Sequence, residues 1–140
     1  ATGDWIIFMN SGDVFYDNIT LFNIYKNNIG YNTVIAGSWL QANNLNQLHL
    51  PNVSFKYGMI GCHQAILVKT EYLKKHYFNT KYIISADFDF FSKFRSDPFF
   101  YLYIYNKPIS IINPDGLGRN KKLYLKEYLE IIYENYGLFS

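Results

Sequence analysis

The sequence predicts an α/β domain, because strand-like apolar runs alternate along the chain with segments typical of helices. Two observations carry this prediction. Trp5–Met9 is an uninterrupted apolar run that ends in polar residues, as a strand buried on both faces of a parallel sheet does. Residues 121–136 repeat apolar side chains at helical spacing and are followed by Gly137. A chain of 140 residues with 49% apolar residues is large enough for a single domain, residues 1–140, with its own core.

Composition narrows the class of protein. Basic residues number 13 and acidic residues 11, a net charge of +2, which gives no electrostatic reason to expect a nucleic-acid partner. No apolar stretch reaches the roughly 18 to 20 residues that span a bilayer, and no signal peptide is visible. The single cysteine, Cys62, cannot form an internal disulfide and is expected to be a buried apolar residue. These features favour a soluble, cytoplasmic protein.

The polar residues Asn10–Asp13 follow the first predicted strand directly. Open α/β sheets bind ligands at the carboxyl ends of their strands, and a carboxylate beside a glycine there can hold a hard cation. Ser-Gly-Asp is also an ordinary turn, and the residues alone favour that simpler interpretation. Residues 17–20 then begin a predicted helix that reaches about Asn27. Its inner face is expected to carry Ile19, Leu21 or Phe22, and Tyr25.

Two further strands are predicted in the middle of the chain. Thr33–Trp39 is rich in β-branched residues, and Gln64–Lys69 is a short apolar run. Residues 41–57 contain many asparagines and a proline, so a surface loop is expected there. Thr70–His76 is expected to be a helix with Thr70 at its N-cap.

Ser85, Asp87 and Asp89 predict the start of another helix. Ser85 has the place of an N-cap, and the positive end of the helix dipole favours two acids in the first turn. The dipole alone accounts well for Asp89 and less well for Asp87. The inward stripe of this helix is expected to consist of Phe90, Phe91 and Phe94.

The last third of the chain predicts strands followed by a long helix. Tyr101–Tyr105 and Pro108–Ile112 are strand-like runs around Asn106-Lys107, expected as a hairpin or a bent pair. Residues 114–120 form a glycine-containing loop before the helix. The helix is expected to bury Leu125, Tyr128, Leu129, Ile132 and Tyr136.

Three short motifs resemble the family 2 glycosyltransferases, which have the GT-A fold, in their residues, order and separation. The first is the strand that ends at Asp13, the second is Gly61–Ala65, and the third is Ser85–Phe91. The resemblance covers most of the 140 residues but only the C-terminal part of a full enzyme. It implies a GT-A-like mixed sheet flanked by helices, without the N-terminal strands and most of the nucleotide-base pocket. The chain is therefore expected to be a fragment.

The resemblance also implies a chemistry. It describes an inverting glycosyltransferase that moves a sugar from a nucleotide-diphosphate donor to an acceptor hydroxyl, in polysaccharide or glycan biosynthesis. This chain departs from the family in having Asn10 where an Asp is usual, which leaves one strong carboxylate for a Mn²⁺ or Mg²⁺ ion. The implied roles are catalytic base at Asp87, acceptor or substrate binding at His63, Gln64 and Asp89, diphosphate binding at Arg119, and metal binding at Asp13 and Asn10.

Other functions stay open at this point. The chain could be a non-catalytic remnant or binding module of the same fold, or Asp13 and Asp87 could serve a metal-dependent phosphate-ester hydrolase. The implied acceptor is a saccharide or is lipid-linked, which includes peripheral contact with the inner face of the cell membrane. The acids Glu127, Glu130 and Glu134 on the last helix argue against binding to an anionic lipid surface.

Overall fold

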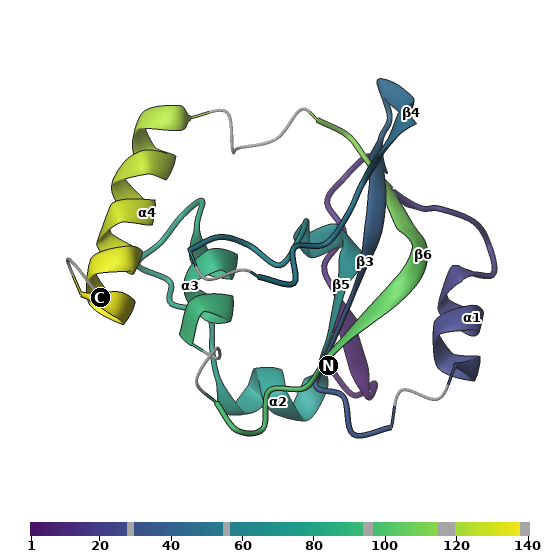
Figure 1. The fold of residues 1–140 in the computed structure, drawn as a ribbon, viewed down its shortest axis with the longest axis horizontal. Helices are drawn as coiled ribbons and strands as arrows, with labels where there is room; N and C mark the ends of the chain where they lie inside the picture. Colours follow the sequence, from purple (N-terminus) through teal and green to yellow (C-terminus); the bar gives the residue numbers. More distant parts are fainter. Residues whose placement is uncertain (28–29, 55–56, 94–96, 115–119, 138–140) are drawn as a thin grey trace.

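A six-stranded mixed sheet with helices on both faces forms the centre of the α/β fold (Figure 1). The computed structural model describes residues 1–27, 30–54, 57–93, 97–114 and 120–137. The strands are β1 (Trp5–Ile7), β2 (Val14–Phe15), β3 (Val34–Gln41), β4 (Asn44–His49), β5 (Ile66–Lys69) and β6 (Leu102–Ile112). The helices are α1 (Thr20–Lys26), the short 3₁₀ helix η1 (His63–Ala65), α2 (Thr70–Lys75), α3 (Ala86–Lys93) and α4 (Lys121–Tyr136).

The strand β3 is the centre of the sheet and is covered on both faces. The strand order is β1-β5-β3-β6-β2, with β4 attached to β3; β6 runs parallel to β3, and the other pairs are antiparallel. Val34, Ile35 and Ala36 have no exposed surface. Because side chains alternate along a strand, Val34 and Ala36 enter the core on one face and Ile35 the core on the other. The predicted strand Thr33–Trp39 is confirmed.

The first strand differs from its prediction. β1 comprises only Trp5–Ile7, and among the described residues it pairs with β5 alone, in antiparallel orientation. Its three residues are half-buried, so the prediction that Trp5–Met9 is a strand buried on both faces of a parallel sheet is wrong. An apolar run indicates that its side chains are buried, but it does not indicate how many strands pair with it. Here Trp5 and Ile7 pack on one face only.

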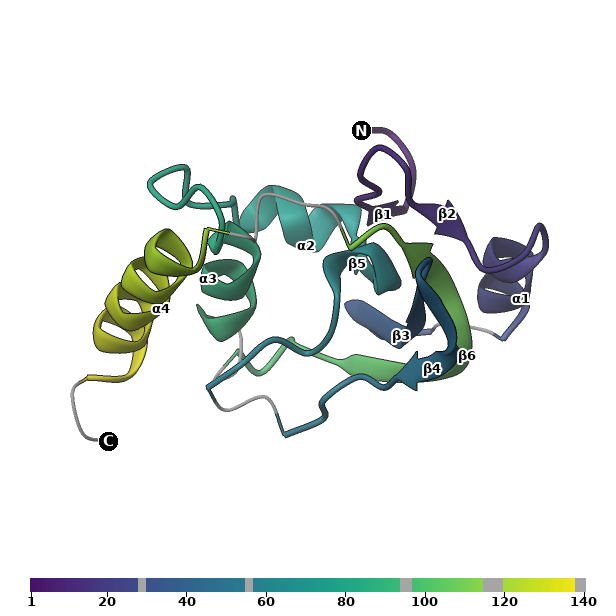
Figure 2. The same ribbon diagram turned by 90° about the horizontal axis from the view of Figure 1, so that it is seen from above.

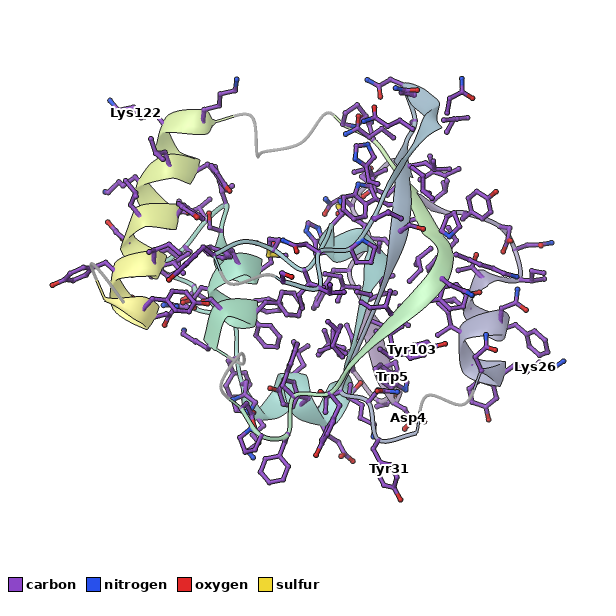
Figure 3. The ribbon with its side chains drawn as sticks, viewed as in Figure 1. Asp4, Trp5, Lys26, Tyr31, Tyr103 and Lys122 are labelled. Carbon is purple, nitrogen blue, oxygen red and sulfur yellow. The ribbon has the colours of Figure 1, made fainter. Side chains whose placement is uncertain are left out.

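Two layers of helices sandwich the sheet. In Figures 1 and 2, α3 lies on one side of the sheet with α4 beyond it, and α1 lies on the other side. Phe90 and Phe91 of α3 and Tyr72 of α2 pack on the first face, while Ile24 of α1 packs on the second. Trp5 and Tyr103, labelled in Figure 3, pack against the cluster that contains Ile24. A third cluster joins α3 to α4 through Tyr82, Phe88 and Ile131.

Two helices turn a different face inward than predicted. In α1 the buried residues are Thr20 and Ile24, whereas the predicted inner residues Ile19, Leu21, Phe22 and Tyr25 are exposed. In α4 the buried residues are Glu127 and Ile131. Two predicted core residues of α4, Leu125 and Leu129, are 55% and 57% exposed. The helix bounds themselves are confirmed, including the end of α4 at Gly137, whose φ is 73°.

Two predicted connections are strands instead. Residues 44–49, expected within a surface loop, form β4, which pairs with β3 and leaves most of its side chains exposed. The two strand-like runs around Asn106-Lys107 form one bent strand, β6, whose register on β3 shifts between Tyr105 and Pro108. This confirms the bent arrangement and excludes the hairpin. Gly37 lies at the bend, where an added Cβ would come within 2.5 Å of the Ile109 side chain.

The start of α2 is not capped by Thr70 as predicted, whereas α3 starts where it was expected. The Thr70 hydroxyl makes no cap bond to α2; it donates to the carbonyl oxygen of Gly3, and the Thr70 N–H donates to the Asp4 carbonyl. α3 begins directly after Ser85, as expected. The predicted inward residues Phe90 and Phe91 are buried, and Phe94 lies outside the described residues. In the described part of the chain, no helix has the length and apolar character needed to cross a membrane.

Candidate functional site

A cleft of about 1160 Å³ lies between the sheet and the α3–α4 layer. The polar segment after β1, the 3₁₀ helix η1 and the end of β6 form its sheet side. The segment before α3, the first turn of α3 and one face of α4 form its helix side. The cleft therefore brings together the three motifs singled out in the sequence. Its lining includes Asn10, Asp13, His63, Gln64, Asp87 and Asn113.

A tight turn after β1 places Asp13 in the cleft. The Asp13 N–H donates to the carbonyl oxygen of Asn10 at 3.1 Å, and Gly12 has a φ of 89°, which favours glycine. Asp13 Oδ2 accepts hydrogen bonds from the Asn10 N–H at 3.1 Å and from Gln64 Nε2 at 2.9 Å. Asp13 Oδ1 accepts one from the Asn113 N–H at 2.7 Å. The carboxylate is thus held by three segments that are far apart in sequence.

Gln64 lies behind Asp13. Its side chain is buried; its amide nitrogen donates to Asp13, and its amide oxygen accepts from the Cys62 thiol at 2.5 Å. Both ends of the amide are therefore used inside the protein, and Gln64 orients the Asp13 carboxylate. Cys62, expected to be fully buried, is partly exposed and lines the cleft. Burial raises the pKa of the Cys62 thiol to about 11, which makes it a poor nucleophile at neutral pH.

His63 connects the first motif to the third. Its Nδ1 lies 3.1 Å from Asp87 Oδ2, and its Nε2 lies 3.4 Å from Asn10 Nδ2. The side chains of His63 and Asp87 are 33% and 27% exposed, so both remain open to a ligand in the cleft. Because the Asn10 N–H also binds Asp13, a hydrogen-bonded chain runs from Asp13 through Asn10 and His63 to Asp87.

Asp87 sits in the first turn of α3, where the helix dipole favours a negative charge. Its Oδ1 accepts a hydrogen bond from the backbone N–H of Phe88 at 2.8 Å.

The segment that leads into α3 is held by hydrogen bonds to a side chain of α4. Glu127 is buried, and its two carboxylate oxygens accept the backbone N–H groups of Ile83, Ile84 and Ser85 at 2.8 to 2.9 Å.

Glu127 is charged in spite of its burial. Burial alone would raise its pKa, but the three backbone hydrogen bonds outweigh that effect and hold the pKa below the ordinary glutamate value. In the sequence, Glu127 stands out only as one of three acids that argue against binding to an anionic lipid surface. Glu127 lies four residues before Ile131, the most deeply buried residue of α4, and so shares its face, but only the structure shows that this face is the buried one.

Asp89 lies apart from the cleft. It is fully buried, its Oδ2 accepts from Lys93 Nζ, and its Oδ1 accepts from Asn135 Nδ2 at 3.3 Å. Asn135 also donates to Ser92 Oγ at 2.7 Å. These contacts join α3 to α4, so in this structure Asp89 is a packing residue that no ligand in the cleft can reach. Arg119 lies outside the described residues. Two positions later, Lys121 lines the cleft.

The oxygen ligands in the cleft are few. Among the described residues, no group of three or more His, Cys, Asp or Glu side chains could hold a metal ion. Asp13 offers one carboxylate, and the Asn10 amide offers a neutral oxygen. This set fits Mg²⁺ or Mn²⁺ in the manner of sites that take one or two protein oxygens and complete the shell with substrate phosphate and water.

The helix side of the cleft carries aromatic residues that sequence reasoning assigned to the core or left out. Phe88 of α3 and Tyr124 and Tyr128 of α4 all line it. Helical spacing could have found the pair, since Tyr124 and Tyr128 lie four residues apart, but it could not place them against a cleft.

Comparison with protein-family models, curated proteins and solved structures finds no significant match to this chain.

Proposed function

We propose that this chain is the catalytic part of an inverting, GT-A-like glycosyltransferase that moves a sugar from a nucleotide-diphosphate donor to a hydroxyl of a saccharide or lipid-linked acceptor. One observation carries the proposal: the hydrogen-bonded chain that links Asp13 to Asp87 along a single cleft. The reaction needs one carboxylate to hold a metal ion beside the leaving group. It needs a second carboxylate to take the proton of the acceptor hydroxyl. The resemblance of the three motifs to family 2 glycosyltransferases supports the same assignment.

In the proposed reaction, Asp87 takes the proton of the acceptor hydroxyl as its oxygen attacks the anomeric carbon of the donor. The bond from that carbon to the diphosphate oxygen breaks, and the nucleoside diphosphate leaves with the electron pair. Attack opposite the leaving group inverts the anomeric centre. His63 Nδ1 holds one oxygen of Asp87 and so fixes the direction in which the carboxylate faces the acceptor.

Asp13 and Asn10 are the residues that would hold Mn²⁺ or Mg²⁺, and the bound ion would supply positive charge for the departing diphosphate. The protein prepares this position with Gln64 and the Asn113 N–H, which fix both oxygens of Asp13. Lys121, which also lines the cleft, adds a positive charge that suits a phosphate group.

The proposal is tested by calorimetric titration of the full-length enzyme, which the resemblance implies to include the N-terminal nucleotide-base pocket, with UDP and with GDP, in MnCl₂ and in EDTA. Wild-type protein is expected to bind one nucleotide in a Mn²⁺-dependent manner, and Asp13→Ala is expected to lose this binding. Asp4→Ala is the matched control, because Asp4 is exposed and lies outside the cleft. Asn10→Asp, which adds a second carboxylate, should bind Mn²⁺ and nucleotide at least as tightly as wild type.

The proposal fails if wild-type protein binds neither nucleotide, or if Asp13→Ala binds as well as Asp4→Ala. Circular dichroism and thermal melts of each variant separate loss of the site from loss of the fold. Mn²⁺-dependent cleavage of p-nitrophenyl phosphate without nucleotide binding would instead favour a phosphate-ester hydrolase.

A further inference from the structure

Three aromatic rings from α3 and α4 form a stacked row along the helix side of the cleft. The rings of Phe88 and Tyr128 have centroids 5.1 Å apart and planes at 18°, and those of Tyr128 and Tyr124 have centroids 6.0 Å apart and planes at 26°. Phe88 is buried, whereas Tyr124 at the other end is 46% exposed. The row therefore extends from the core into the cleft, and its last ring meets solvent.

The two inner rings of the row, Phe88 and Tyr128, are each held by contacts within the protein. Phe88 packs in the cluster with Ile131 and Tyr82, which joins α3 to α4. The Tyr128 hydroxyl donates to the backbone carbonyl of Tyr57 at 2.6 Å. A ring fixed on both sides loses little conformational entropy when a ligand packs against its neighbour, so the row is preorganised for binding.

The row also lies beside the candidate base. Asp87 directly precedes Phe88 in the first turn of α3. Burial, the neighbouring Tyr128 and the negative charge of Asp87 raise the pKa of Tyr124, so its hydroxyl stays protonated at neutral pH and can donate a hydrogen bond. Lys122, labelled in Figure 3, lies in the first turn of α4, two residues before Tyr124.

The two sides of the cleft differ in chemistry. The sheet side presents amide, imidazole and carboxylate groups from Asn10, His63 and Asp13, whereas the helix side adds the aromatic rings of Phe88, Tyr124 and Tyr128 beside Asp87 and Lys121. A pyranose has the matching composition, with C–H groups on one face and hydroxyl groups around its rim. Pockets that combine an apolar wall with a few converging polar groups are typical of small-molecule sites.

We propose that Tyr124, supported by Tyr128 and Phe88, forms the acceptor subsite: a pyranose ring packs against Tyr124 and turns one hydroxyl toward Asp87. This inference rests on the proposed function and adds to it the position and chemical class of the acceptor. The size of residue 124 then determines which acceptor rings fit, while the sheet side of the cleft remains for the donor diphosphate.

The test uses saturation-transfer NMR of the full chain with methyl glycosides of glucose, galactose and N-acetylglucosamine. Wild-type protein is expected to bind at least one of them, with saturation strongest at ring C–H protons. Tyr124→Leu should weaken that binding roughly three- to tenfold, the usual range for losing one aromatic contact. Tyr124→Phe keeps the ring and should retain most of the affinity. Tyr133→Leu is the matched control, because Tyr133 lies exposed on α4 outside the cleft.

Absence of glycoside binding to wild-type protein overturns the inference, as does equal binding by Tyr124→Leu and Tyr133→Leu. Weaker UDP or GDP binding by Tyr124→Leu with unchanged glycoside binding would assign the row to the donor base and would also overturn it. Failure of the inference is distinct from failure of the proposed function, since Mn²⁺-dependent nucleotide binding and its loss in Asp13→Ala do not involve Tyr124.

Discussion

His63 Nδ1 and Asp87 Oδ2 lie 3.1 Å apart, although the two residues are separated by 24 positions in the chain. The contact joins η1, on the sheet side of the cleft, to the first turn of α3 on the helix side. It gives Asp87 a fixed orientation and leaves part of both side chains open to the cleft. A carboxylate that only capped a helix would not need an imidazole partner from another segment.

Asp87→Asn is expected to lower sugar transfer by roughly 10² to 10⁴, because the amide keeps the size of the side chain but cannot take a proton at neutral pH. Nucleotide binding should barely change, since the donor contacts are assigned to the other end of the cleft. Radiolabelled transfer from a nucleotide sugar, combined with calorimetry, measures both effects. Wild-type turnover in the variant would remove Asp87 from the reaction.

Asp89→Asn is the internal control, two residues further along the same helix. The substitution removes the ion pair of a fully buried carboxylate with Lys93 and disturbs the hydrogen bond from Asn135. We expect it to destabilise the fold by about 1–3 kcal/mol in urea unfolding, with transfer by the folded protein nearly unchanged. A loss of sugar transfer without a loss of stability would instead support the acceptor-binding role that the resemblance implies for Asp89.

Glu127→Gln is expected to destabilise the protein by roughly 2–4 kcal/mol at pH 7, because a neutral amide oxygen replaces a charged acceptor of three backbone N–H groups. The pKa of Glu127 is lowered on folding, so its contribution to the unfolding free energy is complete above the unfolded value of about 4.3. The contribution is lost as the pH falls through the lower folded value.

The free-energy gap between wild type and Glu127→Gln should therefore narrow in acid and stay constant between pH 6 and 8. Urea unfolding at a series of pH values measures the gap. Glu130→Gln, on the same helix but half-exposed, is the control and should show only a small gap at any pH. A gap for Glu127→Gln that widened in acid would contradict the lowered pKa.

Gly37→Ala is expected to cost about 1–3 kcal/mol of stability, because the new methyl group would overlap the buried side chain of Ile109. Gly58→Ala is the matched control, since nothing lies within 4 Å of an added Cβ there. The double variant Gly37→Ala/Ile109→Ala should lose less stability than the sum of the losses in the two single variants. The reason is that the shorter Ala side chain at position 109 removes the overlap with the new methyl group at residue 37. Strict additivity would show that the contact is not the cause.

Cys62 should react with iodoacetamide on the order of 100-fold more slowly than free cysteine at pH 8, because its raised pKa of about 11 leaves little thiolate. The rate should rise about tenfold per pH unit from pH 7 to 10, as the thiolate fraction does. Mass spectrometry of timed samples measures the rate. A plateau near pH 9 would show an ordinary thiol.

The sequence located most elements but not their inner faces. The start of α3 after Ser85 and the end of α4 at Gly137 were predictable, because they depend on local chemistry: acids in a first turn and a glycine that adopts a positive φ. The buried face of α4 was not predictable, because Leu and Tyr occur on several of its faces. A buried Glu127 follows only when three N–H groups of another segment lie opposite it.

The candidate site was predictable as a set of motifs but not as an arrangement. Asp13, His63 and Asp87 were singled out, and the structure places all three in one cleft. Nothing local reveals that Gln64 serves Asp13 or that Asp89 faces α4, since both contacts join segments 46 or more residues apart. Likewise, β3 and not β1 is the central strand, a property set by strand order and not by the apolar content of either run.

The contact between Glu127 and the segment before α3 also sets an order of assembly. Synthesis on the ribosome proceeds from the N-terminus, so the backbone N–H groups of Ile83, Ile84 and Ser85 emerge well before the carboxylate that binds them. Until α4 has left the exit tunnel, the apolar surface of Phe88 also lacks its partner Ile131. The helix side of the cleft therefore lacks the face contributed by α4 until α4 has been made.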